Sequence, residues 1–149
     1  MRYYEDLPVG GKFGTASVIV SEADIVAFAS QFDPQVFHLD AAAEKNTLFG
    51  QLVASGWHTA SLSMRLMVQG ELQPAGGMIG LGIEDIKWPK PVLPGDTLRV
   101  VSEVIEARLS ASKPDRGLVK IRNMTLNQHG HTVQVMTSVQ IVLRRPVAP

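Results

Sequence analysis

An acid and an imidazole stand five positions apart in the first third of the chain, Asp33 and His38. They follow an apolar stretch with helical spacing, and Pro34 places both in a predicted loop, where side chains at this separation can converge on one small molecule. A carboxylate and a neutral imidazole together can hold a water molecule, orient it and move its protons. The structural alternative is that Asp33 caps an Asp-Pro turn and His38 is a satisfied structural residue.

A second candidate lies at the start of a predicted buried helix, Gly56–Gln69. Ser55 is a suitable N-cap, and Gly56 leaves a backbone N–H free where a ligand can approach closely. Such an N–H, aided by the helix dipole, can donate to a carbonyl oxygen that gains negative charge during a reaction. The alternative is an ordinary helix start, with glycine chosen for close packing.

The elements that would position these groups follow from the spacing of apolar residues. A cap residue and the apolar positions after it predict an amphipathic helix over Glu22–Gln31, which Pro34 ends. Residues 33–39 are therefore expected to form a loop, and a second short helical piece is expected over Asp40–Lys45. A first strand is predicted over Lys12–Val20.

After the helix Gly56–Gln69 the pattern changes to strands. Four are predicted: Met78–Trp88, Leu98–Leu109, Leu118–Asn127 and Thr132–Leu143. A change of apolar phase in the third predicts a β-bulge near Asn123, and His129-Gly130 predicts a tight hairpin turn. A strand, then helices, then four consecutive strands indicate an α+β fold, with a curved antiparallel sheet packed on one dominant helix.

Composition narrows the class of protein. The 149 residues, 45% of them hydrophobic, suit a single domain, and the absence of cysteine excludes disulfides, Cys-ligated zinc and thiol nucleophiles. Fourteen basic and fourteen acidic residues balance, which argues against a nucleic-acid partner. No apolar run approaches the ~18 residues of a membrane span, and Met1–Gly10 lacks a signal-peptide pattern. We therefore expect no membrane partner and a cytoplasmic location.

The segments around both candidate sites resemble the MaoC-like dehydratases, the (R)-specific enoyl-CoA hydratase branch of the hot-dog fold. The resemblance covers most of the chain and is carried by three motifs: Asp33…His38-Leu39-Asp40, Phe49-Gly50…Ser55-Gly56 and Lys90-Pro91-Val92-Leu93-Pro94-Gly95-Asp96-Thr97-Leu98. It implies a hydratase/dehydratase of fatty acid metabolism that adds water reversibly to a trans-2-enoyl-CoA thioester. In that role Asp33 and His38 would be the catalytic acid/base pair.

The resemblance further implies that Ser55 and Gly56 bind the substrate, with the Gly56 N–H donating to the thioester carbonyl. It implies one hot-dog domain over residues 1–149, an acyl-CoA substrate, and no cofactor or metal. We expect a homodimer whose sheets join edge to edge, because pairing removes an exposed edge strand. Three positions depart from the family signature, since Gln35 and Val36 stand where it has Asn and Pro, and Ser55 stands where His is frequent.

Two other functions of hot-dog proteins remain open from the sequence. An acyl-CoA thioesterase commonly carries a carboxylate on or beside the central helix, and residues 56–70 contain no Asp or Glu. A non-catalytic acyl-thioester binding protein would keep the fold without turnover. A metal site at His129 and His131 would need a third ligand, so solvated turn histidines are the simpler interpretation.

Overall fold

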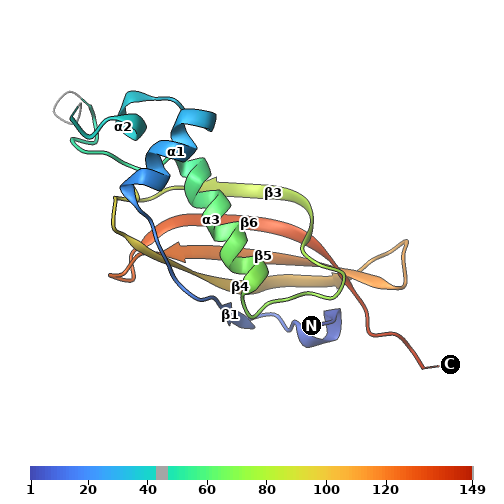
Figure 1. Ribbon diagram of the computed structural model, residues 1–149. Helices are drawn as coiled ribbons and strands as arrows, with labels where there is room; N and C mark the ends of the chain where they lie inside the picture. The colour runs from blue at the N-terminus through green and yellow to red at the C-terminus, as the bar shows by residue number, and fades with distance from the viewer. Residues whose placement is uncertain (43–46, 149) are drawn as a thin grey trace.

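The computed structural model describes residues 1–42 and 47–148. Its main feature is one long helix, α3 (Gly56–Gln69), lying across an antiparallel sheet, with two shorter helices grouped near the start of α3 (Figure 1). This is the predicted α+β arrangement of a hot-dog fold. The bounds of α3 agree with the prediction, because Ser55 caps its start and Gly70 follows its last residue. Among the described residues, no helix is long and apolar enough to cross a membrane.

The N-terminal part differs from the prediction in two places. A 3-10 turn, η1 (Tyr4–Asp6), precedes two short strands, β1 (Lys12–Gly14) and β2 (Val18–Ile19), where one strand was expected. The interruption has a physical cause, because the Thr15 hydroxyl accepts a hydrogen bond from the Val100 N–H at 2.9 Å and so replaces the backbone ladder there.

The helices after these strands also need one correction. Helix α1 (Glu22–Phe32) ends just before Asp33, as Pro34 requires, but a one-turn helix, α2 (Val36–Leu39), occupies part of the expected loop. Pro34 restricts the residue that precedes it and leaves the residues after it free to form a turn. Half of the helical piece predicted over Asp40–Lys45, residues 43–45, lies outside the described residues.

The four long strands occur in the predicted order. They are β3 (Ile79–Lys87), β4 (Thr97–Leu109), β5 (Arg116–Leu126) and β6 (Thr132–Leu143). Together with β1 they form a sheet of order β1-β4-β5-β6-β3, and β2 pairs with β4; every pairing is antiparallel. The hairpin predicted at His129-Gly130 is confirmed, since Gly130 has φ 75° and donates to the Asn127 carbonyl.

The β-bulge predicted near Asn123 is wrong. Asn123 pairs in register with both neighbouring strands, and the irregularities of β5 pairing lie at Val104/Glu106 and Thr125/Leu126 instead. The apparent change of phase arises because polar side chains continue the buried face of the strand. Asn123 and Thr125 are 1% and 0% exposed. They are satisfied by hydrogen bonds from neighbouring elements rather than by apolar contacts.

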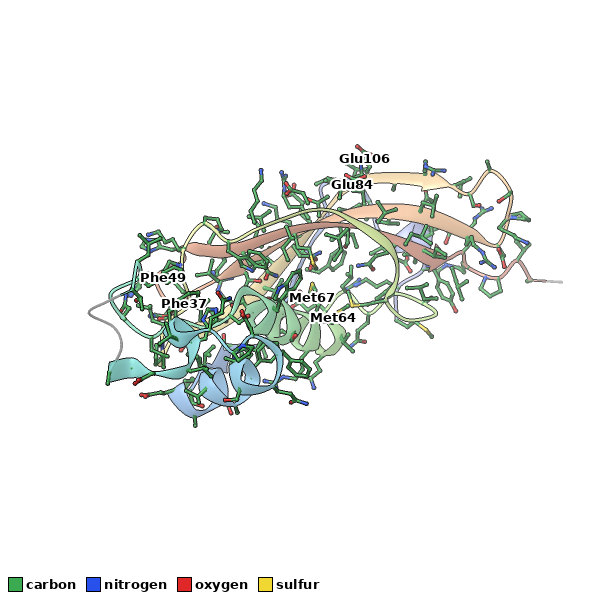
Figure 2. The ribbon with its side chains drawn as sticks, turned by 90° about the horizontal axis from the view of Figure 1, so that it is seen from above. Phe37, Phe49, Met64, Met67, Glu84 and Glu106 are labelled. Carbon is green, nitrogen blue, oxygen red and sulfur yellow. The ribbon has the colours of Figure 1, made fainter. Side chains whose placement is uncertain are left out.

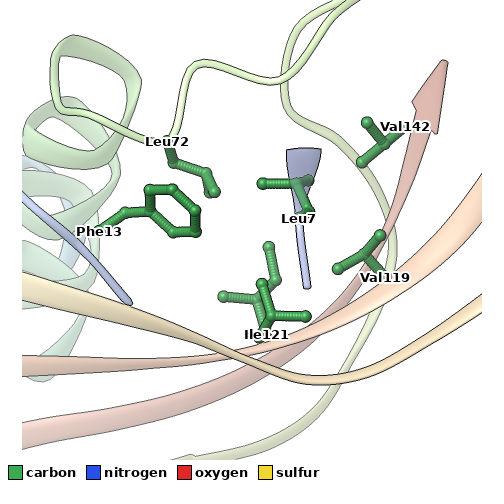
Figure 3. Close-up of a cluster of buried hydrophobic side chains, with 7 residues drawn as sticks. Leu7, Phe13, Leu72, Val119, Ile121 and Val142 are labelled. Carbon is green, nitrogen blue, oxygen red and sulfur yellow. The ribbon is translucent and has the colours of Figure 1, made fainter. Parts of the chain in front are cut away.

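Two apolar clusters pack at opposite ends of α3. One joins η1, β1 and the sheet and includes Leu7, Phe13, Leu72, Val104, Val119, Ile121 and Val142 (Figure 3). The other includes Ile25 of α1, Leu52 and Val92, and it lies under the segment that leads into α3. On the sheet face away from α3, Lys120 forms ion pairs with Glu84 and Glu106, which Figure 2 shows side by side. The second cluster anchors the part of the chain where Asp33 and His38 lie.

Candidate active site

The structure brings the predicted acid and imidazole together. Asp33 is the residue at the C-terminal end of α1, and His38 lies on α2. His38 Nε2 is 3.2 Å from Asp33 Oδ2, and the two side chains are 7% and 17% exposed. The intervening Pro34 turns the chain back, so that residues from two short elements meet. His38 therefore comes from a helix rather than from the expected loop, while its contact with Asp33 is the one that the spacing suggested.

A backbone carbonyl fixes the orientation of His38. Its Nδ1 is 2.6 Å from the carbonyl oxygen of Val53, which only accepts hydrogen bonds, so Nδ1 carries a proton. Val53 is held in turn, because its own N–H donates to the Phe37 carbonyl at 3.0 Å. Nε2 is the other ring nitrogen, and it is the one directed at Asp33. Val53 could not be identified from the sequence, because any residue type offers a backbone carbonyl.

Hydrogen bonds keep Asp33 charged. Desolvation raises the pKa of Asp33, but hydrogen bonds from Gln35 and Ser55, together with the nearby His38, outweigh it and place the pKa below the ordinary value of 3.8. The Gln35 bond is short, with Nε2 2.6 Å from Asp33 Oδ1. Gln35, which departs from the family signature, thus orients the carboxylate. Asp33 is a carboxylate at neutral pH.

Ser55 and Gly56 take different places at the start of α3. Ser55 is 0% exposed; its hydroxyl bonds to Asp33 and accepts from the Trp57 N–H at 3.2 Å. Its direct contact with substrate stays a prediction. Gly56 faces a cleft and is the first residue of α3. Among the described residues its N–H has no acceptor, as the first turn of a helix dictates unless a cap supplies one.

The cleft measures about 430 Å³ and contains the three groups described so far. Asp33, His38 and Gly56 line it. Its other walls are largely aromatic and apolar, with Phe37, Phe49, Trp57, Trp88 and the stretch Pro89–Val92. The rings of Phe37 and Phe49 are 5.3 Å apart and lie at the end of the molecule occupied by α1 and α2 (Figure 2). Such a cleft excludes water from most of its surface and leaves a few polar groups to act.

Trp88 explains why position 56 is glycine. A Cβ added at Gly56 would lie 2.5 Å from Trp88 Cε2, closer than carbon atoms can approach. Trp88 is held in place by a hydrogen bond from its Nε1 to Gln134 Oε1 at 3.0 Å, and Gln134 is 0% exposed. The glycine is therefore needed for packing as well as for the exposed N–H. Trp88 was missed as a site residue because it is distant from Gly56 along the chain.

Lys90 supplies a positive charge to the cleft. It lines the same wall as Trp88, and its Nζ lies 3.3 Å from His131 Nδ1. His131 and His129 are both exposed, with ring centroids 5.8 Å apart. His58, by contrast, is buried outside the cleft, stacked on Phe28 at 4.8 Å, and desolvation lowers its pKa.

Comparisons with known proteins agree with this geometry. Residues 6–124 match the MaoC like domain family. The crystal structure of a MaoC-like dehydratase from Rhodospirillum rubrum is 48% identical, covers 99% of this chain and 100% of its own, and superposes with a TM-score of 0.95. An R-hydratase from Pseudomonas aeruginosa is 27% identical over 99% of this chain and 92% of its own, with a TM-score of 0.76.

A curated relative extends the comparison to a named substrate. The mesaconyl-CoA hydratase of Cereibacter sphaeroides is 38% identical over 68 residues, which are 46% of this chain and 20% of that protein. The family match spans the acid/base pair, the helix start and the aromatic wall. The chain belongs to the MaoC-like dehydratase family.

Proposed function

We propose that the protein catalyses reversible addition of water to a trans-2-enoyl thioester, giving a 3-hydroxyacyl thioester. The observation that carries this proposal is the meeting of three groups in one cleft. They are a carboxylate with a lowered pKa at Asp33, an imidazole at His38 whose Nε2 faces that carboxylate, and an N–H without an acceptor among the described residues at Gly56.

Each group has one part in the reaction. A water molecule hydrogen-bonded to both Asp33 and His38 gives a proton to His38 Nε2 while its oxygen bonds to C3. The π electrons of the C2–C3 bond move to the thioester oxygen, and this negative charge is stabilised by the Gly56 N–H. The enolate then collapses and C2 takes the proton from Nε2. Asp33 holds the remaining hydrogen of the water and favours the protonated imidazole. Because His38 Nε2 both takes and returns the proton, the oxygen at C3 and the new hydrogen at C2 add to the same face of the double bond.

His38 is the better base of the two. The pKa of Asp33 lies below its ordinary value, so its carboxylate is a weak proton acceptor at neutral pH. The proton on His38 Nδ1, held by the Val53 carbonyl, leaves Nε2 as the lone-pair nitrogen of the neutral ring. Asp33 therefore serves as the group that orients water and stabilises the imidazolium.

The thioester is proposed to be an acyl-CoA. Lys90 offers a cation at the cleft for an anionic substrate, and the aromatic walls suit its apolar parts. A relative named for its CoA substrate, the mesaconyl-CoA hydratase, supports the same class. No part of this chemistry needs a cofactor.

The working form is proposed to be a homodimer joined along β3. This strand is at one edge of the sheet and pairs only with β6 among the described strands. Its apolar residues Ile79, Leu81 and Ile83 are 46%, 58% and 57% exposed. Pairing two such edges would satisfy the open backbone groups of β3 and remove part of this apolar surface from water.

A hydration assay tests the proposed reaction. Loss of the enoyl absorbance is followed with enoyl-CoA thioesters of several lengths, for wild type and for Asp33→Asn and His38→Ala. Each substitution should lower kcat/KM by about 100–10,000-fold, the usual contribution of general acid–base groups. Asp115→Asn and His129→Ala, which change exposed residues away from the cleft, are the matched controls and should keep the wild-type rate.

Two outcomes would replace the proposal. Release of free CoA without hydration would make the protein a thioesterase. Binding of thioesters without any turnover would make it a binding protein. Wild-type hydration rates in both Asp33→Asn and His38→Ala would show that another pair of groups moves the proton.

A further inference from the structure

A groove between α3 and β3 adjoins the acid/base cleft at Trp57, which lines both. It measures about 670 Å³. Four methionines contribute to its walls, Met64, Met67, Met78 and Met136. Met64 and Met67 lie on α3, away from the end of the molecule that contains Phe37 and Phe49 (Figure 2). An apolar, methionine-rich groove beside the cleft suits the acyl chain of a thioester, because methionine adapts to irregular shapes.

The floor of the groove is polar, which a plain acyl chain does not require. Ser138 and Gln140 of β6 line it, and they are 6% and 5% exposed. They end a row of buried hydrogen bonds across the sheet. Ser102 donates to Asn123 at 2.7 Å, and the amide groups of Asn123 and Gln140 both donate to the Ser138 hydroxyl, at 3.5 and 3.4 Å. The row runs from the core to the groove.

The last member of the row is incomplete. The carbonyl oxygen Oε1 of Gln140 is buried and has no hydrogen-bond partner among the residues that the structure describes. A buried acceptor without a donor is costly, and most buried polar groups are paired. An alkyl chain in the groove would cover this oxygen without satisfying it. A hydroxyl group on the chain would donate to it and so restore the pairing.

The position of Gln140 sets the length of chain that reaches it. Gln134 holds Trp88 over Gly56, where the thioester carbonyl would bind. Gln140 follows six positions later on β6, about 20 Å of extended strand at ~3.3 Å per residue. A short acyl group at the cleft would end well before Gln140. Only a long chain, directed along the groove, would bring its far end to this amide.

We infer that the preferred substrate is a long-chain acyl thioester that carries a hydroxyl group near the far end of the chain, bound by the Gln140 amide. This inference rests on the proposed function, because it places the thioester at Gly56 and the chain in the methionine-lined groove. The Ser138 hydroxyl accepts a hydrogen bond from the Gln140 amide, and the methionines cover the methylene groups of the chain between Gly56 and Gln140. The groove thus selects the substituent at the far end, while Asp33 and His38 act on the C2–C3 bond.

Binding of unreactive thioesters tests the inference separately from catalysis. Saturated acyl-CoA thioesters of increasing length, each with and without a terminal hydroxyl, are titrated by calorimetry and by tryptophan fluorescence. At short lengths the two series should bind equally. At lengths that reach Gln140 the hydroxylated series should bind about tenfold more tightly, equal to about 1.4 kcal/mol. The matched change Gln140→Met, which lines this position with another methionine, should remove that preference.

Controls separate this effect from damage to the fold. Gln69→Leu changes an exposed glutamine at the end of α3 and should keep the preference. Circular dichroism and gel filtration should show the same fold and assembly for Gln140→Met as for wild type. If that variant fails to fold, the wild-type comparison of the two series still decides the question.

Other outcomes would overturn the inference. Equal binding of both series at every length would show that the Gln140 oxygen is satisfied in another way, such as by water. An equal loss of affinity for both series in Gln140→Met would show a structural role for the amide. If hydroxylated thioesters bind more tightly than plain ones but the matching enoyl thioesters are not hydrated, the inference stands and the proposed function fails.

Discussion

Replacing Gly56 by alanine tests how closely the helix start is packed. The new Cβ would lie 2.5 Å from Trp88 Cε2 and 2.8 Å from Cδ2 and Cζ2. Carbon atoms in contact are normally ~3.5–4.0 Å apart, so the indole must move by about 1 Å. Such a movement would lengthen the 3.0 Å bond from Trp88 to Gln134, whose side chain is fully buried.

The expected loss of stability is the balance of three effects. Overpacking costs about 1–3 kcal/mol, and an unsatisfied buried acceptor at Gln134 costs about 1–3 kcal/mol. Alanine regains up to about 1 kcal/mol through its better helix propensity. We expect the free energy of unfolding to fall by about 1–6 kcal/mol for these reasons. Displacing the Gly56 N–H should also lower kcat of hydration, with a loss of about 100-fold if the donor is lost.

Chemical denaturation and the hydration assay measure these two effects. Gly14→Ala is the matched control, because its Cβ would meet only Glu71 at an ordinary 3.7 Å, and it should leave both quantities close to wild type. Adding Trp88→Phe to Gly56→Ala should recover part of the lost stability, since the smaller ring leaves room. A stable and active Gly56→Ala protein, or a double variant no better than the sum of its single changes, would refute the packing argument.

Three further predictions concern other parts of the chain. Ser55→Ala should lower the free energy of unfolding by about 1 kcal/mol through loss of the α3 cap and should raise the pKa of Asp33, measured by denaturation and NMR titration. The pKa of His58 is lowered by desolvation, so the unfolded chain binds more protons below its ordinary value of 6.5 and stability should fall as the pH drops below it. His58→Phe should weaken this dependence in denaturation curves at several pH values. Leu81→Lys should turn the proposed dimer into a monomer by light scattering.

Local patterns predicted the main elements and the pairing of Asp33 with His38. The cap at Ser55, the absence of helix breakers and Gly70 together determine the helix over Gly56–Gln69, and all of these signals lie in or beside it. Pro34 similarly ends α1. The meeting of Asp33 and His38 follows from the turn between them, so the six residues from Asp33 to His38 contain most of the information.

Contacts between distant segments could not be predicted in this way. The Trp88 ring reaches Gly56 only because the sheet folds over α3, and its partner Gln134 lies on another strand. The Val53 carbonyl that orients His38 is a backbone group, which any residue type could provide. The unexpected turn at α2 depends on packing of its residues between α1 and the segment before α3 rather than on a strong local signal.

The buried polar row has a consequence for how the strands find their alignment. On β6 the inward face carries the polar Gln134, Ser138 and Gln140 beside the apolar Met136 and Val142, whereas the opposite face carries the half-exposed apolar residues Val139 and Ile141. A slip of one residue would reverse the faces and turn these apolar side chains inward, so burial of hydrocarbon alone would not reject the wrong alignment. Directional bonds such as Ser102 to Asn123 exist only in the native one. The register of the strands therefore depends on hydrogen bonds between buried polar side chains. The residues proposed to bind the substrate thus also disfavour misaligned strands.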